Sequence, residues 1–148
     1  MRARGFTLVE LVVTLVIVGI LGVVVVPRLN FVRGFDEIGF RDEVRATLEY
    51  ARKSAVAQRR NVQVSIAGGV VTTTIDNDIP EGGGAGSFGR DLRLPGGSGN
   101  QVTAPAGVTL SPDVDITFDP LGRPSAGAVL AVSGAGNIVL EAETGYVH

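Results

Sequence analysis

The residues that could carry chemistry are few, and no set of them forms a catalytic motif. His148 is the only histidine and the last residue of the sequence, and the sequence has no cysteine. Catalytic groups need a fixed geometry, so a histidine at a chain end is expected to be solvated rather than to act as a general base or a metal ligand. No Ser-His-Asp or Cys-His set can be built around it. We expect a protein that is not an enzyme.

Two groups of carboxylates could hold a calcium ion through their oxygen atoms. Neither group has the spacing of an EF-hand loop, and aspartates beside strands are common turn residues. The groups are Asp76, Asp78 and Glu81, and Asp113, Asp115 and Asp119. We expect turn acids, with no bound metal and no cofactor.

Two glycine-rich stretches invite comparison with phosphate-binding loops. GGGAGSFGR at residues 82–90 lacks the GK[ST] ending, and no helical pattern follows it. GAGN at residues 134–137 lies between two strand-like runs, where glycine supplies the positive φ of a hairpin turn. We interpret both stretches as loops or turns rather than nucleotide sites.

The basic residues between positions 45 and 60 could contact nucleic acid. Acidic residues are interleaved with them, no aromatic platform accompanies them, and the net charge of the chain is −2. The basic residues are Arg45, Arg52, Lys53, Arg59 and Arg60. We expect a solvated or subunit-facing helix surface and no nucleic-acid partner.

Glu10 is the only charged residue between Phe6 and Val26. As a helix this run would extend about 31 Å, close to the thickness of a bilayer core. A carboxylate at the bilayer centre costs about 2.5–3.5 kcal/mol on insertion scales, so its presence needs a reason. No small-residue cleavage site follows the apolar core, so we expect the segment to be retained. Arg2 and Arg4 on the short first flank predict a cytoplasmic N-terminus.

A second helix is predicted beyond Pro27, which should kink or loosen the first. Gly34 and Gly39 should weaken the stretch that follows. Apolar residues then recur at helical spacing on one face, with Glu49 and Lys53 as a favourable pair on the exposed side. The apolar face consists of Phe40, Val44, Leu48, Ala51 and Ala55. We expect one long helix from about residue 6 to about residue 60.

The pattern then changes to the two-residue period of strands. VQVSI (62–66) and VVTTTI (70–75), joined by AGG, predict a hairpin, and AVLAV (128–132) and IVLEA (138–142) predict another. Strand-like runs also occur at 108–110 and 114–118. Residues 79–100 are rich in glycine and form a long predicted loop. The outline is a long helix and a sheet of about five or six antiparallel strands.

The start of the chain carries a family signature. The basic leader MRARG ends in Gly5 and is followed by Phe6, Thr7, Leu8, Val9, Glu10 and an unbroken apolar run. This order resembles the class III signal of type IV prepilins and type II secretion pseudopilins. The resemblance implies an α+β, pilin-like fold, in which a long N-terminal helix has a transmembrane first half and packs its second half on an antiparallel β-sheet.

The resemblance also implies a division of the chain into a leader, an assembly helix and a head. The leader is residues 1–5, the transmembrane and assembly helix is residues 6–27, and an extracytoplasmic domain is residues 28–148. Within that domain the amphipathic helix is expected at about 40–60 and the sheet at about 62–148.

The family further implies how the N-terminus is processed. Prepilin peptidase would cleave between Gly5 and Phe6 on the cytoplasmic face and methylate the new amine of Phe6. In the filament, the Glu10 carboxylate would pair with the Phe6 ammonium of a neighbouring subunit, because a buried charge is tolerable when it is paired. The implied partners are the peptidase and methyltransferase, other pilin or pseudopilin subunits, inner-membrane lipid and the inner-membrane assembly platform. The subunit would cross the inner membrane once, with a periplasmic head, before it enters a filament.

The C-terminal third resembles the H-type minor subunits, through ITFDPLGRP (116–124) and GNIVLEAETGYVH (136–148). The ETGYV ending is most similar to a minor pilin of mannose-sensitive haemagglutinin-type pili. Major pilins commonly carry a C-terminal disulfide loop, which a chain without cysteine cannot form. Pseudopilin H of a type II secretion system is the main alternative. A DNA-binding competence pilin and a membrane-anchored enzyme or binding domain are further alternatives.

Overall fold

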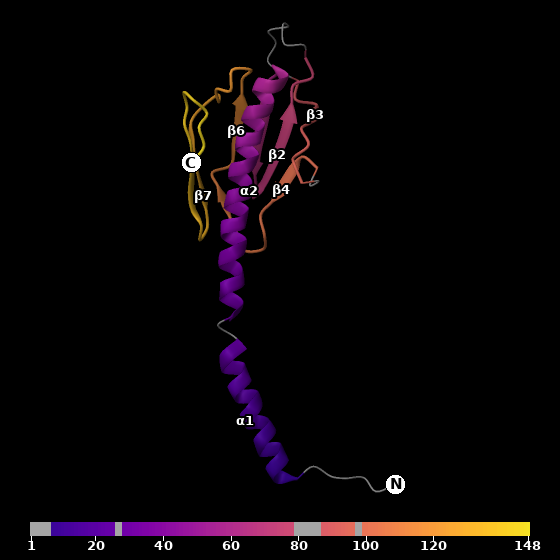
Figure 1. Cartoon of the computed structure of the whole chain (residues 1–148), viewed down its shortest axis with the longest axis vertical. Helices are drawn as coiled ribbons and strands as arrows, with labels where there is room; N and C mark the ends of the chain where they lie inside the picture. The colour runs from indigo at the N-terminus through magenta and orange to yellow at the C-terminus, as the bar shows by residue number, and fades with distance from the viewer. Residues whose placement is uncertain (1–6, 26–27, 79–86, 97–98) are drawn as a thin grey trace, which may run out of the picture. The chain divides into compact units, whose positions relative to one another are not determined.

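The structure, a computed structural model, describes residues 7–25, 28–78, 87–96 and 99–148. The chain divides into two compact units, residues 1–35 and 36–148. In chain order the elements are α1 (Leu8–Val25), α2 (Arg28–Gln58), β1 (Val62–Ala67), β2 (Val70–Ile75), β3 (Arg90–Asp91), β4 (Gln101–Thr103), β5 (Leu110–Ser111), β6 (Val114–Phe118), β7 (Ala128–Val132) and β8 (Gly136–Leu140). Figure 1 colours the chain by residue number and labels α1, α2, β2, β3, β4, β6 and β7.

Helix α2 starts at Arg28 and continues through Gly34 and Gly39 to Gln58, within the helical stretch predicted from about residue 6 to about residue 60. The two glycines, which were expected to weaken the helix, do not interrupt it. Each glycine costs a helix about 1 kcal/mol relative to alanine, which a helix of 31 residues with a well-packed face can absorb. The predicted break at Pro27 lies outside the described residues.

The C-terminal end of α2 is closed by a Schellman motif. The Arg60 N–H donates to the Ala55 carbonyl at 3.2 Å, and the Arg59 N–H donates to the Val56 carbonyl at 3.4 Å. Arg59 has a φ of 51°, in the left-handed region that this motif requires and that glycine adopts most easily. The helix therefore ends at the position that the sequence indicated, but with an arginine where glycine is usual.

The strands form two antiparallel sheets rather than the single sheet that the sequence suggested. In the first sheet the order is β3-β2-β1-β6, and β4 also pairs with β2. Both β3 and β4 pair along the edge of β2 that β1 leaves open. The second sheet has the order β5-β7-β8. Pro112, which has no N–H to donate, separates β5 of one sheet from β6 of the other.

Both predicted hairpins are present. Strands β1 and β2 pair from Val62–Ile75 to Ala67–Val70, so a two-residue turn of Gly68 and Gly69 joins them. Both glycines have positive φ, 57° and 78°, as the favoured two-residue hairpin turns require. Strands β7 and β8 pair with Val132 opposite Gly136. The second strand of this hairpin lies two residues earlier than the predicted 138–142.

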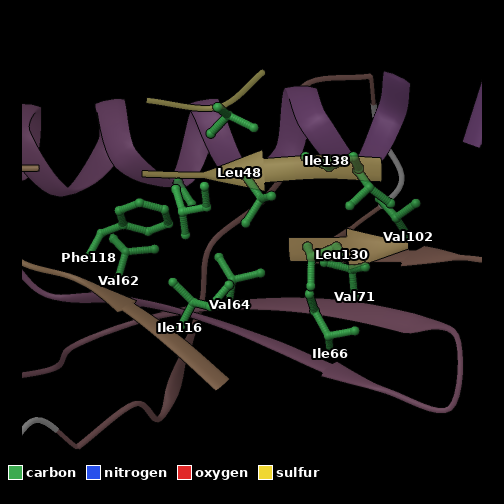
Figure 2. Close-up of a cluster of buried hydrophobic side chains, with 14 of the residues drawn as sticks. Leu48, Val62, Val64, Ile66, Val71, Val102, Ile116, Phe118, Leu130 and Ile138 are labelled. Carbon is green, nitrogen blue, oxygen red and sulfur yellow. The ribbon is translucent and has the colours of Figure 1, made fainter. Parts of the chain in front are cut away.

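The hydrophobic core lies between α2 and the inner faces of the two sheets. All five residues of the predicted helix face are at most 2% exposed. Figure 2 shows Leu48 of α2 above side chains from both sheets, among them Val64, Ile116 and Leu130. In Figure 1, α2 lies in front of the first sheet, with β3 and β4 on one side of it and β6 and β7 on the other. The amphipathic pattern thus correctly identified the side of α2 that faces the sheets.

Part of the predicted loop at 79–100 is anchored to the sheet. The buried Thr73 of β2 donates its hydroxyl to the carbonyls of Leu92, at 2.8 Å, and Asn100, at 3.1 Å. The Asn100 side chain donates to the Asp91 carboxylate at 2.9 Å. Leu92 and Leu94 are buried in the core. The described part of this segment, residues 87–96 and 99–100, is therefore tied to β2, while residues 79–86 and 97–98 lie outside the described residues.

Candidate functional site

Thr7 caps the N-terminus of α1, and Glu10 is part of the same cap. The Glu10 N–H donates to the Thr7 Oγ1 at 3.3 Å, and the Leu11 N–H donates to the Thr7 carbonyl at 3.2 Å. Threonine followed three residues later by glutamate is the spacing of a capping box. A carboxylate in the first turn is also favoured by the helix dipole. Sequence reasoning missed Thr7, although the order TLVE carried the signal.

The surface of α1 is apolar on every side. The large apolar side chains of its residues 8–21 are about 50–80% exposed, and Glu10 is the only charged residue of the helix. The Thr14 hydroxyl donates to the Leu11 carbonyl at 2.9 Å, so this polar group is satisfied within the helix. The exposed residues are Leu8, Val9, Leu11, Val12, Val13, Leu15, Val16, Ile17, Val18, Ile20 and Leu21. A helix that is apolar all round is suited to apolar neighbours on all sides.

The predicted cleavage and methylation residues, Gly5 and Phe6, lie outside the described residues, as does the predicted leader. Their roles, and the pairing of Glu10 with Phe6, therefore stay predictions.

In the part of the chain that the structure describes, no helix combines the length and the apolar character needed to cross a membrane. The predicted span of residues 6–27 stays a prediction.

Three of the six candidate calcium ligands accept hydrogen bonds from backbone N–H groups at turns. The Asp119 Oδ1 accepts hydrogen bonds from the N–H groups of Leu121, at 2.9 Å, and Arg123, at 2.8 Å. Asp113 accepts from the Gly68 N–H at 3.1 Å. Buried Asp76 accepts from the Asp78 N–H at 2.9 Å. Among the described residues, no group of three or more potential ligands could hold a metal ion; Glu81 lies outside them.

The predicted basic surface of α2 is largely engaged within the head, residues 36–148. Glu49 pairs with Arg45 at 3.4 Å and with Lys53 at 3.6 Å, as the spacing of the latter pair indicated. The Arg52 Nε donates to the Gly122 carbonyl at 3.3 Å. Arg60 donates to the Asp76 carbonyl at 3.0 Å. The Arg52 guanidinium joins α2 to the turn at Gly122, and the Arg60 guanidinium joins the residues just after α2 to the end of β2.

His148 is held at the edge of the second sheet rather than at a free end. Its N–H donates to the Val139 carbonyl at 3.0 Å, and its carbonyl accepts from the Val139 N–H at 2.7 Å. Its exposed ring stacks on Tyr146 with ring centroids 5.4 Å apart. The backbone of the last residue thus extends the pairing of β8.

The glycine turn at 134–137 faces a carboxylate of the chain itself. Gly134 has a φ of 74°, and a Cβ placed there would collide with the Glu37 carboxylate. The adjacent Ala135 carbonyl accepts from Arg41 Nη1 at 3.0 Å. This turn therefore receives side chains of α2, and an anion would compete with Glu37 for the same space.

Two protein-family models match the sequence. The prokaryotic N-terminal methylation motif matches residues 1–26. The type II transport protein GspH matches residues 41–145. Among curated proteins, none matches the chain.

The fold is shared with the type IV minor pilin FimU of Pseudomonas aeruginosa strain PAO1. Two crystal forms of FimU align with TM-scores of 0.54 and 0.53 and with 19% and 18% sequence identity. Each alignment covers 74% of this chain, and they cover 84% and 89% of the FimU chains. At this identity the likeness shows the fold, an N-terminal helix packed on antiparallel sheet.

An apolar N-terminal helix with a methylation motif, followed by this α+β head, defines a subunit of the pilin-like class. Because the family model covers residues 41–145, the chain belongs to the type II transport protein GspH family. It is a type IV pilin-like minor subunit or a GspH pseudopilin of the cell envelope. Membership of this family implies processing by prepilin peptidase and assembly with other pilin subunits.

Proposed function

We propose that the chain is a minor pilin of a type IV pilus of the mannose-sensitive haemagglutinin-like kind, assembled through α1. The observation that supports this most is the surface of α1, whose large apolar side chains are exposed on all sides around one acid at the capped end. Exposed apolar area costs about 25 cal/mol per Å² in water. Such a helix is stable in lipid or against other helices of the same kind.

The N-terminal segment would serve in turn as a signal, a membrane anchor and an assembly helix. Prepilin peptidase removes residues 1–5 and methylates Phe6, and residues 6–27 hold the subunit in the inner membrane with its head in the periplasm. The assembly platform then moves the subunit into the filament. There Glu10 pairs with the Phe6 ammonium of a neighbour, which compensates the burial of both charges.

The head would act by contact with other subunits rather than by catalysis or by binding nucleic acid. Asp76, Asp113 and Asp119 accept hydrogen bonds from backbone N–H groups at turns, and Arg45, Arg52 and Arg60 are bonded within the chain. The ETGYV ending and the lack of cysteine support a minor pilin. The GspH family model supports the alternative, a pseudopilin H of a type II secretion system.

The first test is the N-terminal sequence of the protein extracted from membranes. A mature chain beginning with N-methylphenylalanine at position 6 is expected, and an intact Met1 in cells with active peptidase would overturn the proposal. Replacing Gly5 by a bulky residue should leave the leader attached, because the peptidase needs a small residue before the cut.

The second test separates the two filament systems. In a strain that lacks the gene, we expect fewer or shorter surface pili and normal secretion of exoproteins. Loss of secretion with normal piliation would instead assign the chain to a type II secretion system. Complementation with the intact gene controls for effects on neighbouring genes.

A further inference from the structure

Arg52 of α2 is held between two glycine turns of the head. Its Nε donates to the carbonyl of Gly122, which lies in the turn after β6, and in Figure 1 β6 points toward the C-terminal end of α2. Gly122 and Gly145 are buried and have positive φ, 82° and 64°. A Cβ on Gly122 would lie 3.3 Å from the Arg52 Nε, and one on Gly145 would lie 3.2 Å from it. The two turns therefore fit closely around the Arg52 side chain and fix its position.

This arrangement leaves the terminal nitrogens of the Arg52 guanidinium for another partner. The atoms nearest the two glycines are Cγ, Cδ and Nε, and the terminal nitrogens lie beyond them on a residue that is only partly buried. Among the described residues, the side chain donates one hydrogen bond, from Nε, and takes part in none of the ion pairs. A guanidinium presents its N–H groups in a rigid fork that matches the two oxygens of a carboxylate. Arg52 is therefore a fixed donor for an acid from outside the chain.

Exposed apolar side chains flank Arg52. Leu121, next to Gly122, is 73% exposed, the largest value among the large apolar side chains that the structure describes in the head. Its backbone is ordered, because its N–H donates to the Asp119 carboxylate at 2.9 Å. Val56, one helical turn beyond Arg52, is 47% exposed and lies against Gly122. Arginine is enriched at interface hot spots, where neighbouring contacts exclude water. We call Arg52, Val56 and Leu121 the Arg52 patch.

The charges around the Arg52 patch favour a protein acid over nucleic acid as its partner. Glu141 and Glu143, in the turn that leads to Gly145, are exposed, and Glu49 lies one turn of α2 before Arg52. These acids would repel a run of phosphates, and nucleic-acid binding needs several phosphates to be neutralised. A single carboxylate needs only the fork of Arg52.

A second copy of this chain is a poor partner for the Arg52 patch. A symmetric contact would bring the same patch of both copies together, so that two guanidinium groups of like charge would approach one another. A head-to-tail contact would repeat from copy to copy along a filament, which a minor subunit does not do. The neighbours of a minor subunit are unlike subunits.

We propose that the Arg52 patch docks an acidic segment of an unlike pilin subunit. A carboxylate of that segment meets the terminal nitrogens of Arg52, and an apolar side chain beside the carboxylate covers Leu121. The proposal rests on the proposed function and names the chemistry of one partner of the head. The contact is small, and the assembled N-terminal helices supply the remaining affinity by holding the heads at high effective concentration.

Photo-cross-linking of the full-length chain tests the contact. The photoreactive residue p-benzoylphenylalanine replaces Leu121 in cells that assemble the filament, and the product formed under ultraviolet light is mapped by mass spectrometry. We expect a product with an unlike pilin subunit, joined within a few residues of an aspartate or glutamate. The matched control carries the same residue in place of Val129, which is also exposed, at 53%, but lies on β7 of the second sheet. The control should give severalfold less product with that segment.

Charge exchange across the mapped contact gives a second readout. Replacing the mapped acid of the partner by arginine leaves this chain intact and should reduce the product about tenfold, because like charges then meet. Arg52→Glu should reduce it equally in the presence of the normal partner, and the two changes together should restore it. Because Arg52 also holds the turn at Gly122, a merely structural role would not be rescued by a change in the partner. An undiminished product after the change in the partner alone would overturn the proposal.

The other outcomes are equally decisive. A product with a second copy, with lipid or with a segment that lacks an acid would overturn the proposal. So would salt-sensitive retention of a DNA duplex by the full-length chain in detergent that Arg52→Glu abolishes. No product from a chain that enters sheared filaments would overturn the proposal and leave the proposed function intact. A chain that neither loses its leader nor enters filaments would refute the proposed function; a product with the acidic segment would in that case still support the contact, and its absence would overturn both.

Discussion

Glu10 has a local role and a predicted intermolecular role, and one substitution separates them. The local role is in the cap of α1: Glu10 is the third residue of the first turn, and its N–H donates to the Thr7 hydroxyl. Glutamine fills that position of a capping box as well as glutamate does. The intermolecular role is to pair with the Phe6 ammonium of a neighbour, which requires the negative charge. Glu10→Gln therefore removes the pairing and keeps the cap.

We predict that both Glu10→Gln and Glu10→Ala are cleaved normally but enter filaments at least about tenfold less well, because an unpaired ammonium in an apolar core is strongly unfavourable. The measurement is the fraction of mature subunit in sheared filaments, with N-terminal sequencing to confirm cleavage. The control Thr7→Ala should weaken only the cap, by about 1 kcal/mol. Incorporation of Glu10→Gln at the normal level would refute the pairing role.

Arg59 is the other residue whose conformation leads to a prediction. Its φ of 51° at the end of α2 suits glycine, and a non-glycine residue there carries conformational strain. Arg59→Gly should stabilise the head by about 1 kcal/mol, because relief of strain exceeds the added flexibility of the unfolded chain. Urea unfolding of the full-length chain in detergent measures this change in the free energy of unfolding. Arg59→Ala, which keeps the strain, is the control and should change stability little; an equal gain there would point to the side-chain charge instead.

At the scale of the elements, local patterns predicted most of the fold. The spacing of Phe40, Val44 and Leu48 identified the buried face of α2, and AGG between two β-branched runs identified the β1–β2 hairpin. These features depend on residues within a few positions of one another. The capped start of α1 was equally local, and the TLVE spacing should have revealed it.

The features of the fold that the sequence did not predict depend on contacts between residues far apart in the chain. Thr73 bonds to Asn100, 27 positions away, and this contact brings two short strands to the same edge of β2. The alternation of DLRL at residues 91–94 places Leu92 and Leu94 on one face, but it is only four residues long and the glycines that follow it favoured a loop. The division into two sheets likewise depends on long-range pairing: β5, before Pro112, pairs with β7, whereas β6, after it, pairs with β1. No local sequence pattern encodes this choice of partner.

Thr73→Val should therefore weaken the attachment of residues 87–100. The substitution keeps the shape of the side chain but removes the hydroxyl that donates to the Leu92 carbonyl at a buried site. The Asn100 carbonyl loses the same hydroxyl but still accepts from the Thr73 N–H at 2.8 Å. A buried carbonyl left without its partner costs about 1–3 kcal/mol, and we expect a loss of that size. Hydrogen exchange at the amides of Leu92 and Leu94 should become faster. The control, Thr72→Val on the other face of β2, should change stability by less than about 0.5 kcal/mol; equal losses in both variants would contradict the anchoring role.

At the scale of the whole molecule, the two compact units differ in the exposure of their apolar side chains: one unit buries them in a core, and the other exposes the described ones to solvent. Among the residues whose burial the structure describes, the buried hydrophobic ones lie between Phe40 and Val147, in the unit of residues 36–148. In the other unit, the described side chains of α1 are exposed. The head therefore carries its own core, whereas the unit that contains α1 has no described core of its own. This division is what a subunit needs if its helix is to move from lipid to a filament while its head stays folded.

The division predicts that the head folds alone. A chain of residues 36–148 should be soluble without detergent, and in matched detergent its free energy of unfolding should lie within about 1 kcal/mol of that of the full-length chain, because no described core residue is removed. Urea unfolding followed by circular dichroism measures both. A shorter chain of residues 44–148 is the control, since it loses buried Phe40 and the bond from Arg41 to Ala135. Loss of a buried phenylalanine alone costs about 3–5 kcal/mol, so this chain should unfold far more easily. A 36–148 chain that unfolds as readily as the shorter one would show that the N-terminal unit stabilises the head, and that the two do not fold independently.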